Sequence, residues 1–75
     1  MGPFKKKVPV VEMPRQTAAV IAMKNAIKRH ETENADVYQE TVGGNSFPNI
    51  TRAKIEACKG LGDKELARKI SGWDF

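Results

Sequence analysis

Two side chains of this sequence could take part in covalent or acid–base chemistry: the imidazole of His30 and the thiol of Cys58, the single histidine and the single cysteine of the chain. A thiol nucleophile needs a base to activate it and a third group to orient that base. His30 and Cys58 are far apart in the sequence, and no Asn or Asp context suggests such a pairing. We therefore expect Cys58 to pack as a small apolar residue, and we predict that the chain is not an enzyme.

Metal and cofactor binding are not predicted either. A metal site built on His30 and Cys58 would need carboxylates to complete its shell. The nearby acids Glu31, Glu33 and Asp36 lack the alternating ligand pattern and the central glycine of a calcium loop. No glycine-rich phosphate loop follows a convincing strand, so nucleotide hydrolysis is not expected.

A pair of glycines near the C-terminus could bring the backbone close to a phosphate. The tripeptide Gly60-Leu61-Gly62 separates two short segments with helical signals, and Lys59, Lys64 and Arg68 lie beside it. Glycines allow a backbone to approach an anion, and a helix that follows them points its free N–H groups at that anion. These residues predict a phosphate-binding site formed by Lys59, Gly60, Gly62, Lys64 and Arg68.

The run from Ile55 to Ile70 resembles the helix-hairpin-helix motif of nonspecific DNA-binding proteins, in which two short helices are joined by a Gly-hydrophobic-Gly hairpin. The resemblance covers residues 55–70 only, and it implies contacts with the phosphate backbone without sequence preference. The sequence departs from the pattern at Lys59, where the family has proline, and at Asp63, which would compete with a phosphate for the helix N–H groups. The same residues also fit a plain turn between two helices, with Asp63 as the N-cap of the second.

The charge distribution indicates a phosphate backbone or an acidic protein as the partner. The chain has 13 Lys and Arg against 9 Asp and Glu, a net charge of +4. The basic residues form three blocks: Lys5, Lys6 and Lys7; Lys24, Lys28 and Arg29; and, in the C-terminal third, Arg52, Lys54, Lys59, Lys64, Arg68 and Lys69. An acidic cluster of Glu31, Glu33, Asp36 and Glu40 separates the last block from the others. The alternative interpretation is a set of solvated helix faces on a slightly basic domain.

The length of 75 residues predicts a single small domain over residues 8–75, preceded by a flexible basic arm at 1–7. The longest apolar run, Ala18 to Met23, is far shorter than the ~20 residues of a membrane span. No secretory signal is visible, so we expect an intracellular protein without a membrane partner.

The predicted fold is mainly α, with three helices at roughly 15–31, 51–59 and 63–71. A short β pairing of residues 8–13 with 37–42 is also predicted, because the first segment is rich in β-branched residues and the second has an alternating pattern. Gly43 and Gly44 can supply the positive φ angles of a tight turn, so residues 37–50 form either a hairpin or a simple loop with two apolar anchors.

Two functions remain open. The first is a small basic protein that binds DNA or RNA phosphates through Lys5, Lys6, Lys7 and the Gly60–Gly62 hairpin, largely without sequence specificity. The second is a protein-interaction module, such as an inhibitor, adaptor or assembly subunit. It would bind its partner through the exposed side of the first helix or through the strand-like N-terminal segment, with apolar contacts at Val8, Val10, Val11 and Trp73.

Overall fold

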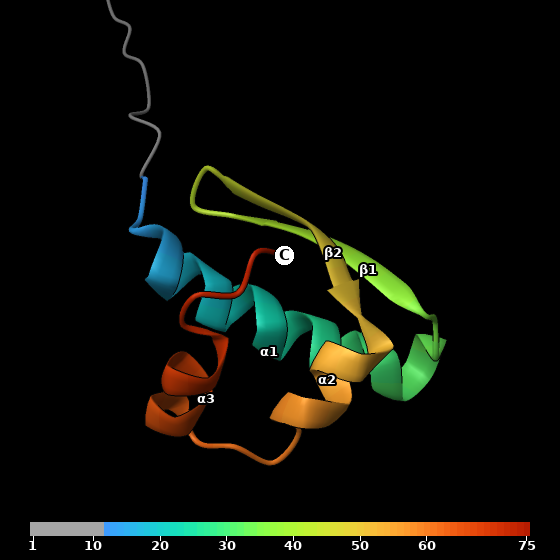
Figure 1. Ribbon diagram of the computed structural model, residues 1–75. Helices are drawn as coiled ribbons and strands as arrows, with labels where there is room; N and C mark the ends of the chain where they lie inside the picture. Colours follow the sequence, from blue (N-terminus) through green and yellow to red (C-terminus); the bar gives the residue numbers. More distant parts are fainter. Residues whose placement is uncertain (1–11) are drawn as a thin grey trace, which may run out of the picture.

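The computed structural model describes residues 12–75. The predicted arm at 1–7 and the strand-like residues 8–11 lie outside this range. The described chain forms three helices and one two-stranded antiparallel sheet, which confirms the predicted mainly α class with a short β pairing (Figure 1). The elements are α1 (Arg15–Glu33), β1 (Val37–Val42), β2 (Asn45–Thr51), α2 (Arg52–Cys58) and α3 (Asp63–Ile70).

Helix α1 contacts all four other elements. The β1–β2 hairpin covers one side of it, and α2 and α3 lie on the other (Figure 1). Ala18, Ala22 and Ala26 are fully buried at four-residue spacing, which places them along one line of the helix. Such small side chains allow close packing, so a single helix can serve as the common support of the domain.

Helix α1 ends two residues later than predicted, at Glu33. Asn34 then adopts the left-handed conformation with φ 53°, and its N–H donates to the carbonyl of His30 at 3.1 Å. Asparagine tolerates this conformation well, which explains the sharp stop. Within residues 12–75 no helix, α1 included, is long and apolar enough to cross a membrane.

Strands β1 and β2 form a tight hairpin, which decides between the two predicted alternatives for residues 37–50. The turn consists of Gly43 and Gly44, both with positive φ, as the sequence predicts. The described partner of the 37–42 strand is therefore residues 45–51. Of the predicted partner segment 8–13, only Glu12 and Met13 are described, and the N–H of Met13 donates to the carbonyl of Gly43 at 3.1 Å.

A β-bulge in β2 explains how Phe47 and Ile50 both reach the core. In a regular strand, residues three apart point to opposite faces. Here Gln39 faces two residues, Pro48 and Asn49, because the register moves from Tyr38–Ile50 to Glu40–Phe47. The extra residue returns the second apolar side chain to the buried face, and Phe47 and Ile50 are both 0% exposed. A proline, which has no N–H for the ladder, is tolerated at such a position.

The C-terminal segment returns to the centre of the domain after α3. Phe75 is buried, and its ring meets Phe47 edge-on at 5.3 Å and Trp73 at 5.9 Å between centroids. The guanidinium of Arg15 donates to the Phe75 carbonyl at 3.3 Å and lies 4.4 Å from the centre of the Phe47 ring. The last residues thus join the start of α1 to the hairpin.

Candidate nucleic-acid interface

The connection between α2 and α3 is a tight turn with the geometry of type II. Lys59 has φ −61° and ψ 136°, Gly60 has φ 82°, and the N–H of Leu61 donates to the carbonyl of Cys58 at 3.3 Å. The third residue of this turn needs a positive φ, which a glycine adopts without strain. The backbone conformation therefore requires Gly60, the first glycine of the predicted phosphate site.

Gly62 has a different role, because its φ of −74° is open to any residue. A Cβ added to Gly62 or to Gly60 would meet no atom within 4 Å, so neither glycine is required by packing. Gly62 is the N-cap of α3, and no side chain accepts a hydrogen bond from the first N–H groups of that helix. The sequence-based assignment of Asp63 as N-cap is wrong: Asp63 is the first helical residue, because the extended residue before it is Gly62.

Four buried apolar side chains hold the two helices of the hairpin on the body of the domain. Ile55 and Cys58 of α2 and Leu66 and Ile70 of α3 are at most 2% exposed. Burial raises the pKa of the Cys58 thiol, against a smaller opposite influence of the Lys69 charge. A protonated, buried thiol is a poor nucleophile, and Cys58 packs as a small apolar residue, as expected from the sequence.

Lys59 and Lys64 stand on the solvent side of this hairpin. Both side chains are exposed, and neither forms an ion pair with another residue of the described range 12–75. Arg68 is also exposed, with Glu65 at 3.9 Å, and with Lys69 it lines an open groove of about 360 Å³ between α2 and α3. The structure thus brings the predicted residues of the C-terminal site onto one two-helix unit.

Two polar contacts join α1 to α3. Gln16 donates to the carbonyl of Ala67 at 2.7 Å, and the ammonium group of Lys24 lies 2.9 Å from a carboxylate oxygen of Asp63. A second groove, of about 380 Å³, runs between these helices with Val20 and Ile21 among its apolar lining residues. This groove lies beside the start of α3.

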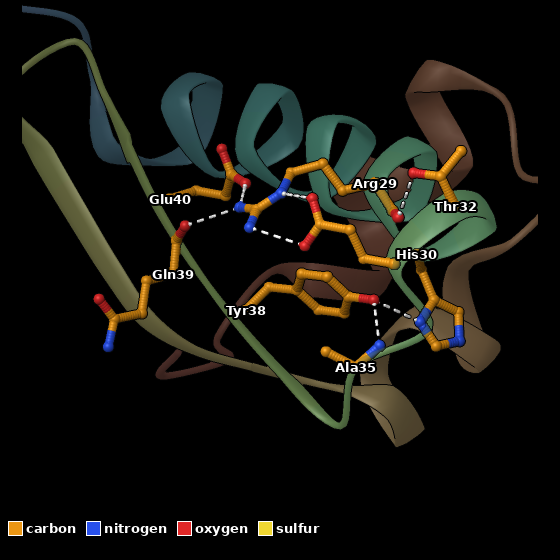
Figure 2. A network of polar contacts seen from close by, with 8 residues as sticks. Arg29, His30, Thr32, Ala35, Tyr38, Gln39 and Glu40 are labelled. Atoms are coloured by element: carbon orange, nitrogen blue, oxygen red, sulfur yellow. Dashed lines mark hydrogen bonds and ion pairs between the residues drawn. The ribbon is translucent and has the colours of Figure 1, made fainter.

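The acidic segment predicted from the sequence is largely neutralised by arginines. Arg29 binds Glu33 through two nitrogens, at 3.0 and 3.1 Å, and also binds Glu40 and the carbonyl of Gln39 (Figure 2). Arg52 binds Asp36 at 3.2 Å. The hydrogen bonds to Glu33 and Glu40 raise the pKa of Arg29 further, and the hydrogen bond from Arg29 lowers the pKa of Glu33.

The side chain of His30 contacts Tyr38 and Glu56, and it has no nucleophile beside it. Its Nδ1 is 2.7 Å from the hydroxyl oxygen of Tyr38, which also accepts a hydrogen bond from the N–H of Ala35 at 2.7 Å (Figure 2). Its Nε2 is 4.0 Å from a carboxylate oxygen of Glu56. Among residues 12–75, no three His, Cys, Asp or Glu side chains are grouped as metal ligands.

Sequence reasoning missed the roles of Arg29 and Tyr38. The contacts of these two side chains join α1 to β1. The only sequence signal for the inward position of Tyr38 was the alternating pattern of residues 37–42. Trp73, predicted as a partner contact, is half-buried and packs against the core, so only part of it is available to a partner. The other predicted contacts lie outside the described residues, namely Lys5, Lys6, Lys7, Val8, Val10 and Val11. Comparisons of the chain with protein-family models, curated proteins and solved structures found no match.

Proposed function

We propose that this protein binds nucleic acid through the α2–α3 hairpin, by contacts with the phosphate backbone and largely without sequence specificity. The observation that carries the proposal is the exposed turn at Gly60 and Gly62, open to close approach and flanked by Lys59 and Lys64, which form no ion pair with residues 12–75. The proposed role is binding and not catalysis, and its nucleic-acid partner implies an intracellular location.

The glycines supply the geometry of this proposal. Because no side chain projects at Gly60 or Gly62, a phosphate can approach the main chain closely. The first N–H groups of α3 are not capped by a side chain, and they can donate to a phosphate oxygen. The motif resemblance of residues 55–70 points to the same surface.

The lysines supply most of the attraction. Each cation that neutralises a phosphate releases bound counterions from the nucleic acid. For every phosphate contacted on a duplex, a tenfold rise in salt therefore lowers the binding constant by about 0.9 logarithmic units. Lys59, Lys64 and Arg68 together therefore predict a steep salt dependence. Lys5, Lys6 and Lys7 would add to it if the N-terminal segment contacts the same strand.

Fluorescence anisotropy with labelled duplex and single-stranded oligonucleotides tests this proposal. We expect binding at about 50 mM salt and, for three phosphate contacts, an affinity about 40-fold lower at about 200 mM. Replacing Lys59, Lys64 and Arg68 by Ala should reduce both the affinity and the salt slope. Absence of binding at low salt, or equal binding by the triple variant, would exclude the hairpin as the site.

Gly62→Ser gives a sharper test, because the two readouts should move in opposite directions. The extended conformation of Gly62 suits a serine N-cap, whose hydroxyl accepts from the first turn of α3, so stability should rise slightly. The same hydroxyl would occupy the N–H groups that a phosphate needs. Tighter folding with weaker oligonucleotide binding supports the proposal, and equal or tighter binding contradicts it.

A protein partner is the second candidate, and the groove between α1 and α3 favours it. Val20, Ile21 and Ala67 give this groove an apolar lining on the exposed side of the first helix, the surface that the sequence suggested. Val20→Gln, which adds a polar group but no charge beside Lys24 and Lys64, would then abolish a salt-tolerant complex recovered from native extract and leave oligonucleotide binding unaffected. Retention of every partner by this variant would remove the groove as an interface.

A further inference from the structure

The ion pair between Lys24 and Asp63 lies at the edge of the proposed interface. The ammonium nitrogen of Lys24 and a carboxylate oxygen of Asp63 are 2.9 Å apart, and the two side chains are 53% and 76% exposed. Both line the groove between α1 and α3, together with Lys64 of the proposed phosphate-binding set. An ion pair this exposed contributes little to folding, so its main effect is on the local charge.

Asp63 is the first residue of α3 and follows Gly62 directly. Its carboxylate would repel a phosphate bound at the hairpin, and it would compete for the same N–H groups. Lys24 comes from a different helix and holds its positive charge against this carboxylate. Held by this ion pair, the carboxylate forms no hydrogen bond with the first N–H groups of α3; without Lys24 it would be free to turn toward them.

We propose that Lys24 of α1 belongs to the nucleic-acid interface and acts as a positioning residue, because its ion pair holds the Asp63 carboxylate toward α1 and leaves the first N–H groups of α3 free for a phosphate. This inference rests on the proposed function. It extends the interface from the α2–α3 hairpin onto α1, to a residue that lies outside the motif resemblance.

A double-mutant cycle tests the inference by fluorescence anisotropy at about 50 mM salt. Lys24→Ala should weaken oligonucleotide binding by about fivefold, because the released carboxylate then competes with the phosphate, and a unit charge at about 4 Å in water corresponds to about a fivefold change. Asp63→Asn should tighten binding by up to about fivefold for the same reason. In the Asp63→Asn background, Lys24→Ala should weaken binding by only about twofold, because the carboxylate that pairs with Lys24 is gone.

Two further variants separate this role from simple loss of charge or of structure. Lys28→Ala removes the same charge from the same helix, one turn further on, and among the described residues Lys28 forms no ion pair. It should weaken binding by no more than about twofold. Lys24→Arg keeps the pairing and should restore affinity close to that of the unmodified protein. If thermal unfolding shows that Lys24→Ala is destabilised, Lys24→Met is used in its place, because methionine keeps the aliphatic part of the side chain and removes the charge.

The outcomes distinguish this inference from the function on which it rests. Binding by the unmodified protein, together with a Lys24 effect that disappears in the Asp63→Asn background, supports it. Equal losses for Lys24→Ala and Lys28→Ala, or a Lys24 effect that is unchanged by Asp63→Asn, would overturn this inference alone. Absence of binding by the unmodified protein would overturn the proposed function and the role of Lys24 with it.

Discussion

Basic side chains serve different purposes in two regions of the molecule. Beside the β1–β2 hairpin, Arg29 satisfies two carboxylates and a backbone carbonyl, and its charge lies 5.2 Å from the centre of the Tyr38 ring. On the α2–α3 hairpin, Lys59 and Lys64 extend into solvent without ion pairs among the described residues. The planar guanidinium suits fixed, multiple contacts, whereas a lysine on a flexible stem remains available to a diffusing anion.

This difference shows which charged side chains remain available to attract a partner. Three of the four side chains in the acidic cluster, Glu33, Asp36 and Glu40, pair with Arg29 or Arg52, so that segment offers little free charge. By contrast, the charges of Lys59 and Lys64 on the α2–α3 hairpin are not offset by ion pairs with residues 12–75. Mutations in the two regions should therefore separate stability from binding.

The largest expected effect is on the anchoring of the α2–α3 hairpin. Leu66→Ala removes a side chain that is 1% exposed and should lower the free energy of unfolding by about 2–5 kcal/mol. Urea denaturation measures this, with the exposed Lys69→Ala as a control that should stay within about 0.5 kcal/mol. A loss below about 1 kcal/mol would mean that α3 is not held by this contact.

A smaller loss is expected at the β1–β2 side, without any effect on binding. Tyr38→Phe deletes the hydroxyl that accepts from Ala35 and contacts His30, and it should destabilise the fold by about 1–3 kcal/mol because buried polar groups lose their partner. Oligonucleotide affinity of the folded variant should not change. If oligonucleotide affinity falls at a temperature where the variant is fully folded, the β1–β2 side also contributes to binding, and the assignment of binding to the α2–α3 hairpin alone is wrong.

The two glycines of the turn should respond unequally to alanine. Gly60→Ala places a side chain on a backbone with φ 82° and should cost about 1–2 kcal/mol. Gly62→Ala has an accessible φ and open space for its Cβ, so its loss should be at most about 1 kcal/mol, the scale of an unfavourable N-cap residue. Thermal unfolding of both variants compares them, and the reverse order would contradict the observed turn.

The smallest effect concerns acidification. Because the hydrogen bond from Arg29 lowers the pKa of Glu33 below its ordinary 4.5, this pair contributes stability above that pH, and the contribution is lost as the pH falls through the lowered value. Glu33→Gln should therefore destabilise the protein at neutral pH and match it in strong acid. The difference should shrink in 1 M salt, because both side chains are exposed. A difference that persists at low pH would assign the effect to packing.

Much of the fold could be predicted from local signals. The helical spacing of the Ala18–Ala26 stretch, the Gly43-Gly44 turn and the N-cap of α2 at Thr51, whose hydroxyl accepts from the N–H of Lys54, all act over a few residues. The partner of β1 was predicted less well, because strand pairing depends on contacts that the pattern of one segment does not specify. The bulge at Pro48 and Asn49 could not be foreseen from alternation alone.

For the candidate interface, the sequence determined by itself the residue types that a phosphate site requires: a Gly-Leu-Gly turn between two helical segments, with lysines beside it. These follow from composition and short-range spacing, which the chain carries whatever its tertiary structure. Only the tertiary structure decided which charges remain available. Arg29 meets Glu40 and Lys24 meets Asp63 only when the hairpin and α3 pack on α1, and Arg52 meets Asp36 only when β1 pairs with β2.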